Sequence, residues 1–486
     1  MNLKHSARKG LQISVTGTAL AVFFFAQSAL AAKPVSLEEL QSQVEKLSQQ
    51  VEKLTGLVEK QGDVIAAQKS QIDAQKTALA TQGEKVAQTA QELDKAAAKM
   101  AAVKPAAGGD EKPPVKITMS PMPKFESADG KYSFQPIGRF HMDITSFDED
   151  KSSQPNNVNF RRSRLGFRGN LGEDFNYKAE VDFAEEKVNF KEVYLAYTGF
   201  DPTEIWLGNF KPPLGLEQNT STNYMPFMEL SPASKVFTRD ESVGGALKTG
   251  GKEWSLAAGV FNEDAGNNDT TQDESISVDA RASVDLWRDN PNVIHLGIGG
   301  SMRRIGAATT FKEETKPAGT GNNLVSTGTI ARVDNSYVYG PEAAAVFGPF
   351  WAQGEYFRNH LDIAEAPDAS FDGWYAQAGF FLTGETRPYK GKIGNFDRLK
   401  PLHPFSLKNG GWGAWEVLAR FDELDLNDVA AGITGGRERD TTVGLNWYPI
   451  DNVRFMANYL WADTDDNAVT ADDDPEIFMF RSQWDF

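Results

Sequence analysis

The chain has 486 residues, more than one hydrophobic core usually supports, so several regions are expected. It has no cysteine, which excludes disulfide bonds, and its 67 acidic against 50 basic residues argue against nucleic acid as a partner. Beyond the N-terminal segment no stretch approaches the ~20 apolar residues of a membrane-spanning helix. The rest of the chain is therefore expected to be soluble or to cross a membrane as a β-barrel.

Residues 1–31 have the layout of a secretory signal peptide. A basic start at residues 4–9 is followed by an apolar run at 11–25 and by small residues at 29–31. The sequence therefore predicts cleavage after Ala31. A membrane anchor is the alternative, which the shortness of the apolar run disfavours.

A heptad repeat follows the signal segment. Ten consecutive apolar residues recur at a spacing of seven: Leu37, Val44, Val51, Val58, Ile65, Ile72, Leu79, Val86, Leu93 and Met100. This repeat predicts a left-handed α-helical coiled coil over residues 32–103, although heptads alone do not fix the oligomer number. A solitary, frayed helix is the alternative. Residues 104–130 are rich in Pro, Gly and Lys and are expected to form a linker.

From residue 131 onward the hydrophobic period changes to two. At the C-terminus Phe478, Phe480 and Trp484 share one parity, while Arg481 and Asp485 share the other. This alternation puts aromatics on one strand face and polar groups on the opposite face, as in the closing strand of an outer-membrane barrel. Sixteen such segments are expected: 134–144, 158–171, 175–185, 188–198, 203–211, 242–250, 252–262, 276–287, 293–305, 334–348, 349–360, 371–383, 411–424, 437–448, 452–463 and 477–486.

The connectors between these segments alternate between tight turns and long acidic loops, which is the pattern of a transmembrane barrel. Sixteen antiparallel strands would leave an aqueous channel. Residues 212–242 are too many for an ordinary loop and are expected to fold into the pore as its third loop. An exposed lid is the alternative. We therefore predict for residues 131–486 an all-β transmembrane barrel of sixteen antiparallel strands with an inward-folded third loop.

The strongest basic cluster lies at residues 160–168. Alternation along this strand places three arginines on the face turned to the lumen: Arg162, Arg164 and Arg168. A guanidinium is always protonated and presents a fork of donors that suits oxyanions, so a row of them favours anion selection. The alternative is that each arginine pairs with an acidic neighbour such as Asp182 or Glu180.

Several stretches resemble one known family. FRRSRLGFRGNL, NYKAEVDF, WLGNFKPPLGLEQNTSTNYMPFMEL, YGPEAAAVFGPFWAQGEYFRN and YAQAGFFLTGETRPYK resemble the phosphate-selective porin O and P family. They follow the family's order from about residue 131 to the C-terminus, so the resemblance covers the barrel and not the heptads. It implies a sixteen-stranded outer-membrane trimer whose third loop folds inward and whose arginines and lysines guide phosphate.

Eleven residues are predicted at the pore. Arg161 and Arg162 match the family's arginine pair at the constriction, and two lysines match its central binding region. The predicted pore-lining, anion-binding residues are Arg161, Arg162, Arg164, Arg168, Asp182, Lys390 and Lys400, and those of the constriction loop are Lys211, Gln218, Asn223 and Glu229. Gln218 and Asn223 stand where the phosphate channels have lysines, which weakens a deep phosphate site that Arg164 only partly restores.

No enzyme, cofactor or metal site is predicted, because the histidines show no metal-ligand spacing and no nucleotide fingerprint is present. We expect a trimeric channel for passive diffusion of small anions, phosphate or polyphosphate among them, in the outer membrane of a Gram-negative bacterium. It would contact lipid and lipopolysaccharide, and its periplasmic coiled coil would extend toward the peptidoglycan. Two alternatives stay open: a weakly selective porin whose coiled coil tethers the outer membrane to the cell wall, and a secreted all-β sugar-binding or hydrolytic protein.

Overall fold

The structure is a computed structural model of the whole chain, and it describes residues 69, 115–119, 122–262, 274–306, 310–465 and 467–486. The predicted signal peptide at 1–31 lies outside the described residues, and so does the predicted coiled coil at 32–103 apart from Lys69. Within the described part of the chain, no helix is both long enough and apolar enough to cross a membrane.

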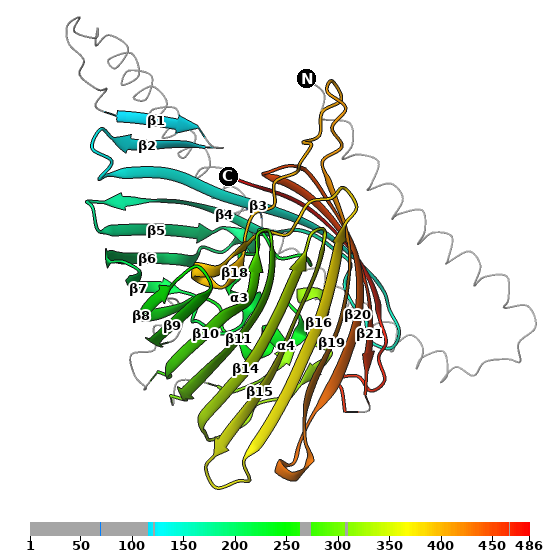
Figure 1. The fold of residues 1–486 in the computed structure, drawn as a ribbon. Coiled ribbons are helices and arrows are strands. Elements are labelled where there is room, and N and C mark those ends of the chain that lie inside the picture. The colour runs from blue at the N-terminus through cyan, green and yellow to red at the C-terminus, as the bar shows by residue number, and fades with distance from the viewer. Residues whose placement is uncertain (1–68, 70–114, 120–121, 263–273, 307–309, 466) are drawn as a thin grey trace, which may run out of the picture. The chain divides into compact units, whose positions relative to one another are not determined.

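Sixteen antiparallel strands form a closed barrel (Figure 1). Each strand pairs with the next along the chain, and the last strand returns to the first through a register that runs from Glu476 opposite Asp148 to Asp485 opposite Arg139. The barrel strands are β3 (Ser133–Asp148), β4 (Asn157–Leu171), β5 (Phe175–Asp182), β6 (Asn189–Phe200), β7 (Thr203–Phe210), β8 (Ser242–Gly250), β9 (Trp254–Phe261), β10 (Ile276–Asp289), β11 (Asn292–Arg304), β14 (Val333–Phe347), β15 (Phe350–Ile363), β16 (Ala369–Phe381), β19 (Ala414–Asp428), β20 (Ile433–Ile450), β21 (Val453–Thr464) and β22 (Glu476–Asp485). The predicted sixteen-stranded barrel is confirmed, and all sixteen predicted segments coincide with its strands.

The two faces of the strands differ as the alternation predicts. On β22 the outward Phe478 and Trp484 are 44% and 46% exposed, whereas the inward Arg481 is fully buried. Large apolar side chains cover the outside of the other strands as well, and the interior holds most of the buried charged side chains together with the apolar residues that pack against the inward loops. This arrangement is the reverse of a soluble protein and suits a barrel surrounded by lipid.

Aromatic side chains in neighbouring strands reinforce the outer face. Trp415 of β19 stacks on Trp447 of β20, which stacks on Phe455 of β21, with ring centroids 5.4 Å apart at each step. Phe480 of β22 continues the row at 6.3 Å. Cross-strand aromatic pairs add about 0.5–1.5 kcal/mol each beyond the burial of their area, so this row stabilises the register of four adjacent strands.

The two ends of the barrel carry different connections. The C-terminus lies at the end where neighbouring strands join through tight turns such as 172–174, 201–202 and 451–452; we call it the short-turn end. The opposite, long-loop end carries the longer connections. One connection at the short-turn end departs from the predicted pattern, because residues 382–413 join β16 to β19 there.

Three of the described connections fold inward. The first is the predicted third loop, residues 211–241, called the pore loop, which contains α3 (Leu216–Asn219) and α4 (Pro232–Phe237). The second inward loop, residues 310–332, contains β12 (Glu314–Thr315), β13 (Val325–Ser326) and the turn η3 (Pro317–Gly319). The return segment, residues 382–413, contains β17 (Tyr389–Lys390), η4 (Gly391–Ile393) and β18 (Asn395–Phe396). Short turns η2 (Ala184–Glu186) and η5 (Val429–Ala431) join strands elsewhere.

The apolar core lies between the inward loops and the inner wall. In the largest buried cluster, Phe237 of the pore loop and Phe311 of the second inward loop pack with wall residues such as Phe357, Leu361 and Leu424. These side chains come from segments that are distant in the sequence, so the loops and the wall are held as one packed unit. The pore loop is therefore confirmed inside the barrel, and the second inward loop and the return segment are additional to the prediction.

A short hairpin precedes the barrel. β1 (Val115–Met119) pairs antiparallel with β2 (Pro123–Ser127), and β2 continues onto β3 through the pair Phe125 and Phe134. These strands occupy part of the segment 104–130 that the composition predicts as a linker. Proline at their ends is compatible with this position, because edge strands tolerate a missing backbone donor.

Candidate functional site

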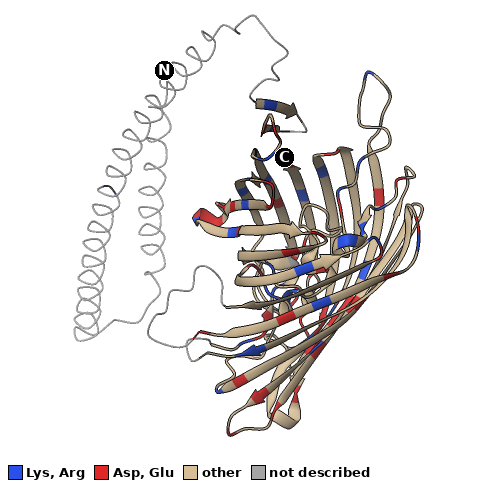
Figure 2. Cartoon of the chain, turned by 60° about the vertical axis from the view of Figure 1, so that its left-hand side comes forward, with Lys and Arg blue, Asp and Glu red and all other residues tan. Residues whose placement is uncertain are grey.

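One large cavity inside the barrel brings all eleven predicted residues together. Its volume is about 730 Å³, and both the predicted pore-lining residues and the predicted residues of the pore loop line it. Twelve lysines and arginines and ten aspartates and glutamates contribute to its wall. Figure 2 shows that basic and acidic residues are interspersed along the strands. The cavity is therefore highly charged but close to electrical balance.

A β-bulge in β4 brings two adjacent arginines to the inner face. Arg162 lies opposite His141 of β3, and the next matched pair is Phe160 with Met142, so Arg161 has no partner in the register. Strict alternation would have sent Arg161 outward, beside the lipid-facing side chains. The bulge instead turns it inward, since an extra residue reorients the side chains around it. Both members of the predicted arginine pair therefore line the cavity.

Glu229 of the pore loop holds three arginines. Its carboxylate oxygens accept from Arg162 Nη1 at 3.0 Å, Arg161 Nη2 at 3.2 Å and Arg481 Nη2 at 2.6 Å. Arg481 also donates to both oxygens of Asp143, at 2.7 and 2.6 Å. Charge-assisted pairs of this kind are strong and directional, so Glu229 fixes the pore loop against β4 and β22. It also neutralises part of the positive charge of the arginine pair.

Further along β4 the arginines and their neighbours form a second network. Arg164 Nε lies 2.8 Å from Asp182 Oδ2, and Arg139 Nε lies 3.0 Å from Glu180 Oε1. Lys178 Nζ lies 3.0 Å from the other oxygen of Glu180. The alternative prediction, in which lumen arginines pair with acidic neighbours, thus describes Arg164 correctly. Fixed pairs leave less charge available to a passing ion.

Three basic residues of the cavity take part in no described ion pair. In the described part of the chain no carboxylate forms an ion pair with Arg168, Lys211 or Lys400. Arg168 Nε donates to Gln135 Oε1 at 3.2 Å, and Lys211 Nζ donates to the Gln218 carbonyl at 2.7 Å. Two carboxylates of the same wall, Glu185 and Asp451, likewise have no described ion pair. The free charge of the described cavity wall is therefore slightly positive.

Side chains of the inner wall hold the tip of the pore loop through its backbone. Arg454 Nη1 donates to the Met225 carbonyl at 2.6 Å, and Asn446 Nδ2 donates to the Pro226 carbonyl at 2.8 Å. The Met228 amide donates to Asn458 Oδ1 at 3.1 Å. Because β20 and β21 supply these groups, the loop tip is attached to the wall next to β22, the strand whose Arg481 contacts Glu229. The narrow part of the pore is therefore set by a rigid element.

The start of the pore loop is attached by a carboxylate. Gly215 has φ 78°, a left-handed conformation that glycine adopts without strain. The chain then presents the Leu216 and Glu217 amides to Glu355 of β15, at 2.6 and 2.8 Å. A side chain at position 215 would also approach Glu355 Oε1 to 3.3 Å. Glycine at this position thus allows the loop to enter the barrel.

Gln218 and Asn223, the two polar residues predicted for the constriction loop, hydrogen-bond to neighbouring groups. Gln218 Nε2 donates to the Arg239 carbonyl at 2.6 Å and to Asp240 Oδ1 at 3.2 Å, within the pore loop itself. Asn223 Oδ1 lies 3.3 Å from His141 Nε2 of β3. Both side chains line the cavity but bring no charge to it. The loop therefore keeps its shape without the two positive charges.

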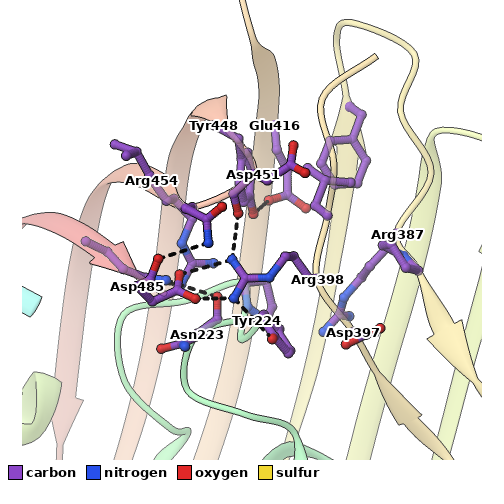
Figure 3. A pocket seen from close by; sticks show the side chains of 17 residues that line it. Asn223, Tyr224, Arg387, Asp397, Arg398, Glu416, Tyr448, Asp451, Arg454 and Asp485 are labelled. Carbon is purple, nitrogen blue, oxygen red and sulfur yellow. Dashed lines mark hydrogen bonds and ion pairs between the residues drawn. The ribbon is translucent and has the colours of Figure 1, made fainter. Parts of the chain in front are cut away.

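The return segment brings two lysines into the cavity from the short-turn end. Figure 3 shows Arg398 between Asp485 and Tyr224. Arg398 pairs with both oxygens of Asp485 and donates to the Asp451 carbonyl at 2.7 Å. Lys390 Nζ pairs with Asp397 Oδ2 at 2.7 Å, whereas Lys400 is among the free cations. Arg398 therefore fastens the segment that carries both predicted lysines.

Other charged residues of the cavity were not predicted. Those that sequence reasoning missed include Arg139, Lys178, Lys191, Glu192, Lys235, Asp240, Glu241, Arg398, Asp451 and Asp485. The signal for several of them was present, since strand alternation already placed Arg139 and Asp485 on the inner face. The signal for Arg398 was absent, because the return segment has no hydrophobic period from which its direction could be inferred.

Comparison with known proteins gives a consistent result. The family described as phosphate-selective porin O and P matches residues 134–486. A protein of Caulobacter vibrioides of uncharacterised function is 30% identical over 363 residues, covering 71% of this chain and 71% of its own. Porin O of Pseudomonas aeruginosa is 29% identical over 402 residues, covering 74% of this chain and 90% of its own. Among solved structures, an anion-selective porin from Comamonas acidovorans shares the fold, with TM-score 0.50 and 13% identity over 73% of this chain and 100% of its own.

Proposed function

The chain belongs to the phosphate-selective porin O and P family, and we propose that its channel passes small anions by diffusion, phosphate among them. As a member of this family it is an outer-membrane channel and not an enzyme. One observation carries the proposed selectivity: Arg168, Lys211 and Lys400 line the cavity with no ion pair to a described carboxylate. Such fixed positive charges lower the electrostatic barrier for anions in a water-filled pore.

In the proposed mechanism, the charges of the cavity wall select anions and the inward loops limit the size of the solute. Free cations raise the local concentration of anions, while the pore loop, the second inward loop and the return segment narrow the path. A hydrated anion would pass between these groups without a covalent step or a cofactor. Gln218 and Asn223 supply dipoles instead of charges, so we expect phosphate to bind weakly and to compete with chloride rather than to exclude it.

The assembly is part of the same proposal. We propose a homotrimer with lipid and lipopolysaccharide around it, a cleaved signal peptide at 1–31, a coiled coil at 32–103 and a linker from 104. The short-turn end of a porin faces the periplasm, and the chain enters β3 at that end. Everything N-terminal to the barrel would therefore lie in the periplasm, where the coiled coil could reach the peptidoglycan.

A second candidate function rests on the ion pairs. Glu229 and Asp182 neutralise Arg161, Arg162 and Arg164, which favours a weakly selective porin whose coiled coil tethers the outer membrane to the cell wall. Deletion of residues 37–100 separates the two candidates. Loss of envelope integrity with unchanged single-channel conductance would favour the tether, whereas intact envelopes would favour the channel as the main function.

The proposed selectivity is tested by the reversal potential of the purified protein in planar bilayers under a KCl gradient. We expect a chloride-directed reversal and partial block of the current by added phosphate. The double variant Arg168→Gln, Lys400→Gln should lower the chloride-to-potassium permeability ratio, because one unit charge at 4 Å in water is worth about 1 kcal/mol, or roughly fivefold per charge.

The control for this experiment is Lys131→Gln. Lys131 is 45% exposed and pairs with Glu173 at 2.6 Å near the short-turn end, away from the described cavity wall. The variant Lys131→Gln removes one positive charge outside the lumen, so the chloride-to-potassium permeability ratio should stay unchanged. A cation-directed or near-zero reversal in the unaltered protein would refute anion selectivity.

A further inference from the structure

A second cavity, which we call the side pocket, lies beside the large one near the short-turn end. Its volume is about 260 Å³. Residues of strands β6 to β10 line it from the barrel wall, the start of the pore loop lines another side, and the turn η4 of the return segment lines a third. Glu192, Lys211 and Asn219 line both cavities. The side pocket therefore opens on the lumen at these three residues.

The lining of the side pocket has an excess of positive charge. Its four cations are Lys211, Lys248, Arg281 and Lys392, and its two carboxylates are Glu192 and Glu204. Arg281 is paired with Glu342 at 2.6 Å, and each of the two carboxylates has a lysine partner, Lys178 for Glu192 and Lys392, at 3.8 Å, for Glu204. Among the described residues no carboxylate pairs with Lys211 or Lys248. The side pocket therefore holds two free positive charges.

Aromatic rings position Lys248 without neutralising it. Its Nζ lies 3.5 Å from the centroid of the Trp206 ring and 4.7 Å from that of Phe210. Tyr194 stacks on Trp206 with centroids 4.0 Å apart, and Trp206 Nε1 donates to Glu204 Oε2 at 2.8 Å, so the Trp206 ring is itself held in place. A ring face attracts an ammonium but offers it no oxygen, and within the described residues Lys248 donates no hydrogen bond. Its three donors are therefore available to an anion.

The side pocket also has an apolar side. Pro213 of the pore loop, Ala257 of β9 and Ile393 of the return segment line it. Ile393 is 51% exposed, so a large apolar side chain remains uncovered there. A cavity of about 150 Å³ already accommodates benzene, so the side pocket has room for a ring, a carboxylate and water. Covering the apolar side chains with a hydrocarbon body would favour binding through the hydrophobic effect.

We propose that the side pocket binds an organic anion, a carboxylate with an apolar body about the size of a benzene ring. The carboxylate accepts from Lys248, with Lys211 at the entrance, and the body lies against Pro213, Ala257 and Ile393. Inorganic phosphate gains nothing from these apolar groups and stays with the free cations of the large cavity. The inference rests on the proposed anion channel, because the solute reaches the side pocket from the lumen, and it adds a second class of solute to phosphate.

Equilibrium dialysis of benzoate against the full-length protein in detergent tests the site without measuring a current. Micelles without protein correct for benzoate taken up by the detergent. We expect one saturable site per protomer that binds benzoate at least fivefold more tightly than acetate, which lacks the ring, or benzyl alcohol, which lacks the charge. Equal binding of benzyl alcohol would indicate apolar partitioning alone, and equal binding of acetate would indicate attraction by charge alone. Either outcome overturns the proposal.

The variant Lys248→Met removes the charge and keeps a long apolar side chain. We expect it to bind benzoate about fivefold more weakly, the effect of one unit charge at 4 Å in water. Lys248→Arg should keep the binding, because a guanidinium keeps both the charge and the contact with the rings. Lys252→Met is the matched control, since Lys252 is exposed in the turn between β8 and β9 and does not line the side pocket. Unchanged binding by Lys248→Met overturns the proposal, and the comparison of the three solutes with the unaltered protein does not depend on the folding of any variant.

Currents in planar bilayers separate failure of this inference from failure of the proposed function. Benzoate should block the chloride current of the unaltered protein, and Lys248→Met should raise the half-blocking benzoate concentration about fivefold while leaving that of phosphate unchanged. A channel that selects anions but binds no benzoate would refute the side pocket alone. A channel that binds benzoate at this site but shows a cation-directed reversal potential would refute the proposed anion selectivity and support the side pocket.

Discussion

Two stretches of the same inner wall carry charges of opposite sign, and these charges are balanced in different ways. The basic stretch, Arg161 to Arg168 on β4, receives its counter-charges from the chain itself, chiefly through Glu229 and Asp182. The acidic stretch, Asp422 on β19 with Glu438 and Asp440 on β20, has one described arginine, Arg420, which Glu217 shares. Strand alternation turns most of these charges inward, the β-bulge of β4 adds Arg161, and the inward loops decide how the charges are balanced.

Solvent access explains much of the difference. The side chain of Arg161 is 29% exposed and opens on the large cavity, whereas Asp440 is 1% exposed. Water and mobile ions can screen a charge in the first position, but the second needs a partner fixed nearby. The comparison teaches that a charged residue inside a channel serves permeation only where a loop leaves it open to water.

The largest effect is expected from Glu229→Gln, which removes the carboxylate shared by three arginines. Breaking a buried ion pair by deleting one partner costs about 3–5 kcal/mol, because the remaining charges stay uncompensated. We expect the free energy of unfolding in urea to fall by that amount. The pore loop should also loosen, which would appear as noisier single-channel currents.

The matched control for Glu229→Gln is Asp240→Asn in the same loop. Asp240 pairs with Lys235 at 3.1 Å, and both side chains are about half exposed, at 55% and 51%. Pairs exposed to solvent contribute about 0–1 kcal/mol, so this change should be small. Equal losses of unfolding free energy in the two variants would show that Glu229 stabilises the protein no more than an exposed carboxylate does.

A smaller effect is expected from Asn223→Lys, which adds a positive charge to the cavity that the basic stretch lines. Asn223 lines the large cavity, and its neutral side chain lies 3.3 Å from His141. An added ammonium should attract a doubly charged oxyanion more than chloride. We expect the phosphate concentration that halves the chloride current to fall roughly fivefold, the value of about 1 kcal/mol per unit charge at 4 Å in water. Asn223→Gln adds no charge and should leave the block unchanged. Equal block by both variants would refute the role of a positive charge at this position.

Strand alternation predicted most of the barrel. The exposed Phe478 and the buried Arg481 lie on the faces that their parity gives, and the three arginines of residues 162–168 line the cavity. Alternation alone failed at Arg161, since a one-residue bulge reverses the face of the extra residue without changing the composition. The family resemblance placed that arginine correctly.

The inward segments were harder to predict. The length of the pore loop indicated that it folds inward, but Phe311 and Arg398 belong to segments whose residues show no regular period. Their positions depend on contacts with strands far away in the sequence, such as Leu424 and Asp485. The acidic stretch is a similar case: Asp422 and Asp440 become neighbours only through the register of β19 against β20.

The most local effect is expected at Glu313, a buried carboxyl with which the acidic stretch can be compared. Glu313 lies in the second inward loop, where it accepts from Asn359 Nδ2 at 3.1 Å. Burial raises its pKa to about 8, against an ordinary value of 4.5. Between these two values the native loop holds a proton that the opened loop releases. Its stability should therefore decrease as the pH rises from 4.5 to 8, and be unaffected by this group below 4.5.

Hydrogen exchange of residues 310–332 at pH 6 and pH 9 measures this dependence. The unaltered protein should exchange faster at pH 9 beyond the intrinsic rate, and Glu313→Gln should remove that excess because its side chain is neutral at both values. Glu314→Gln is the matched control, since Glu314 is partly exposed and pairs with Lys312 at 2.8 Å. If both variants keep the excess, the pH dependence does not come from Glu313. If only Glu313→Gln removes it, the proton that the native loop holds resides on Glu313, and one proton is enough to neutralise this buried carboxyl.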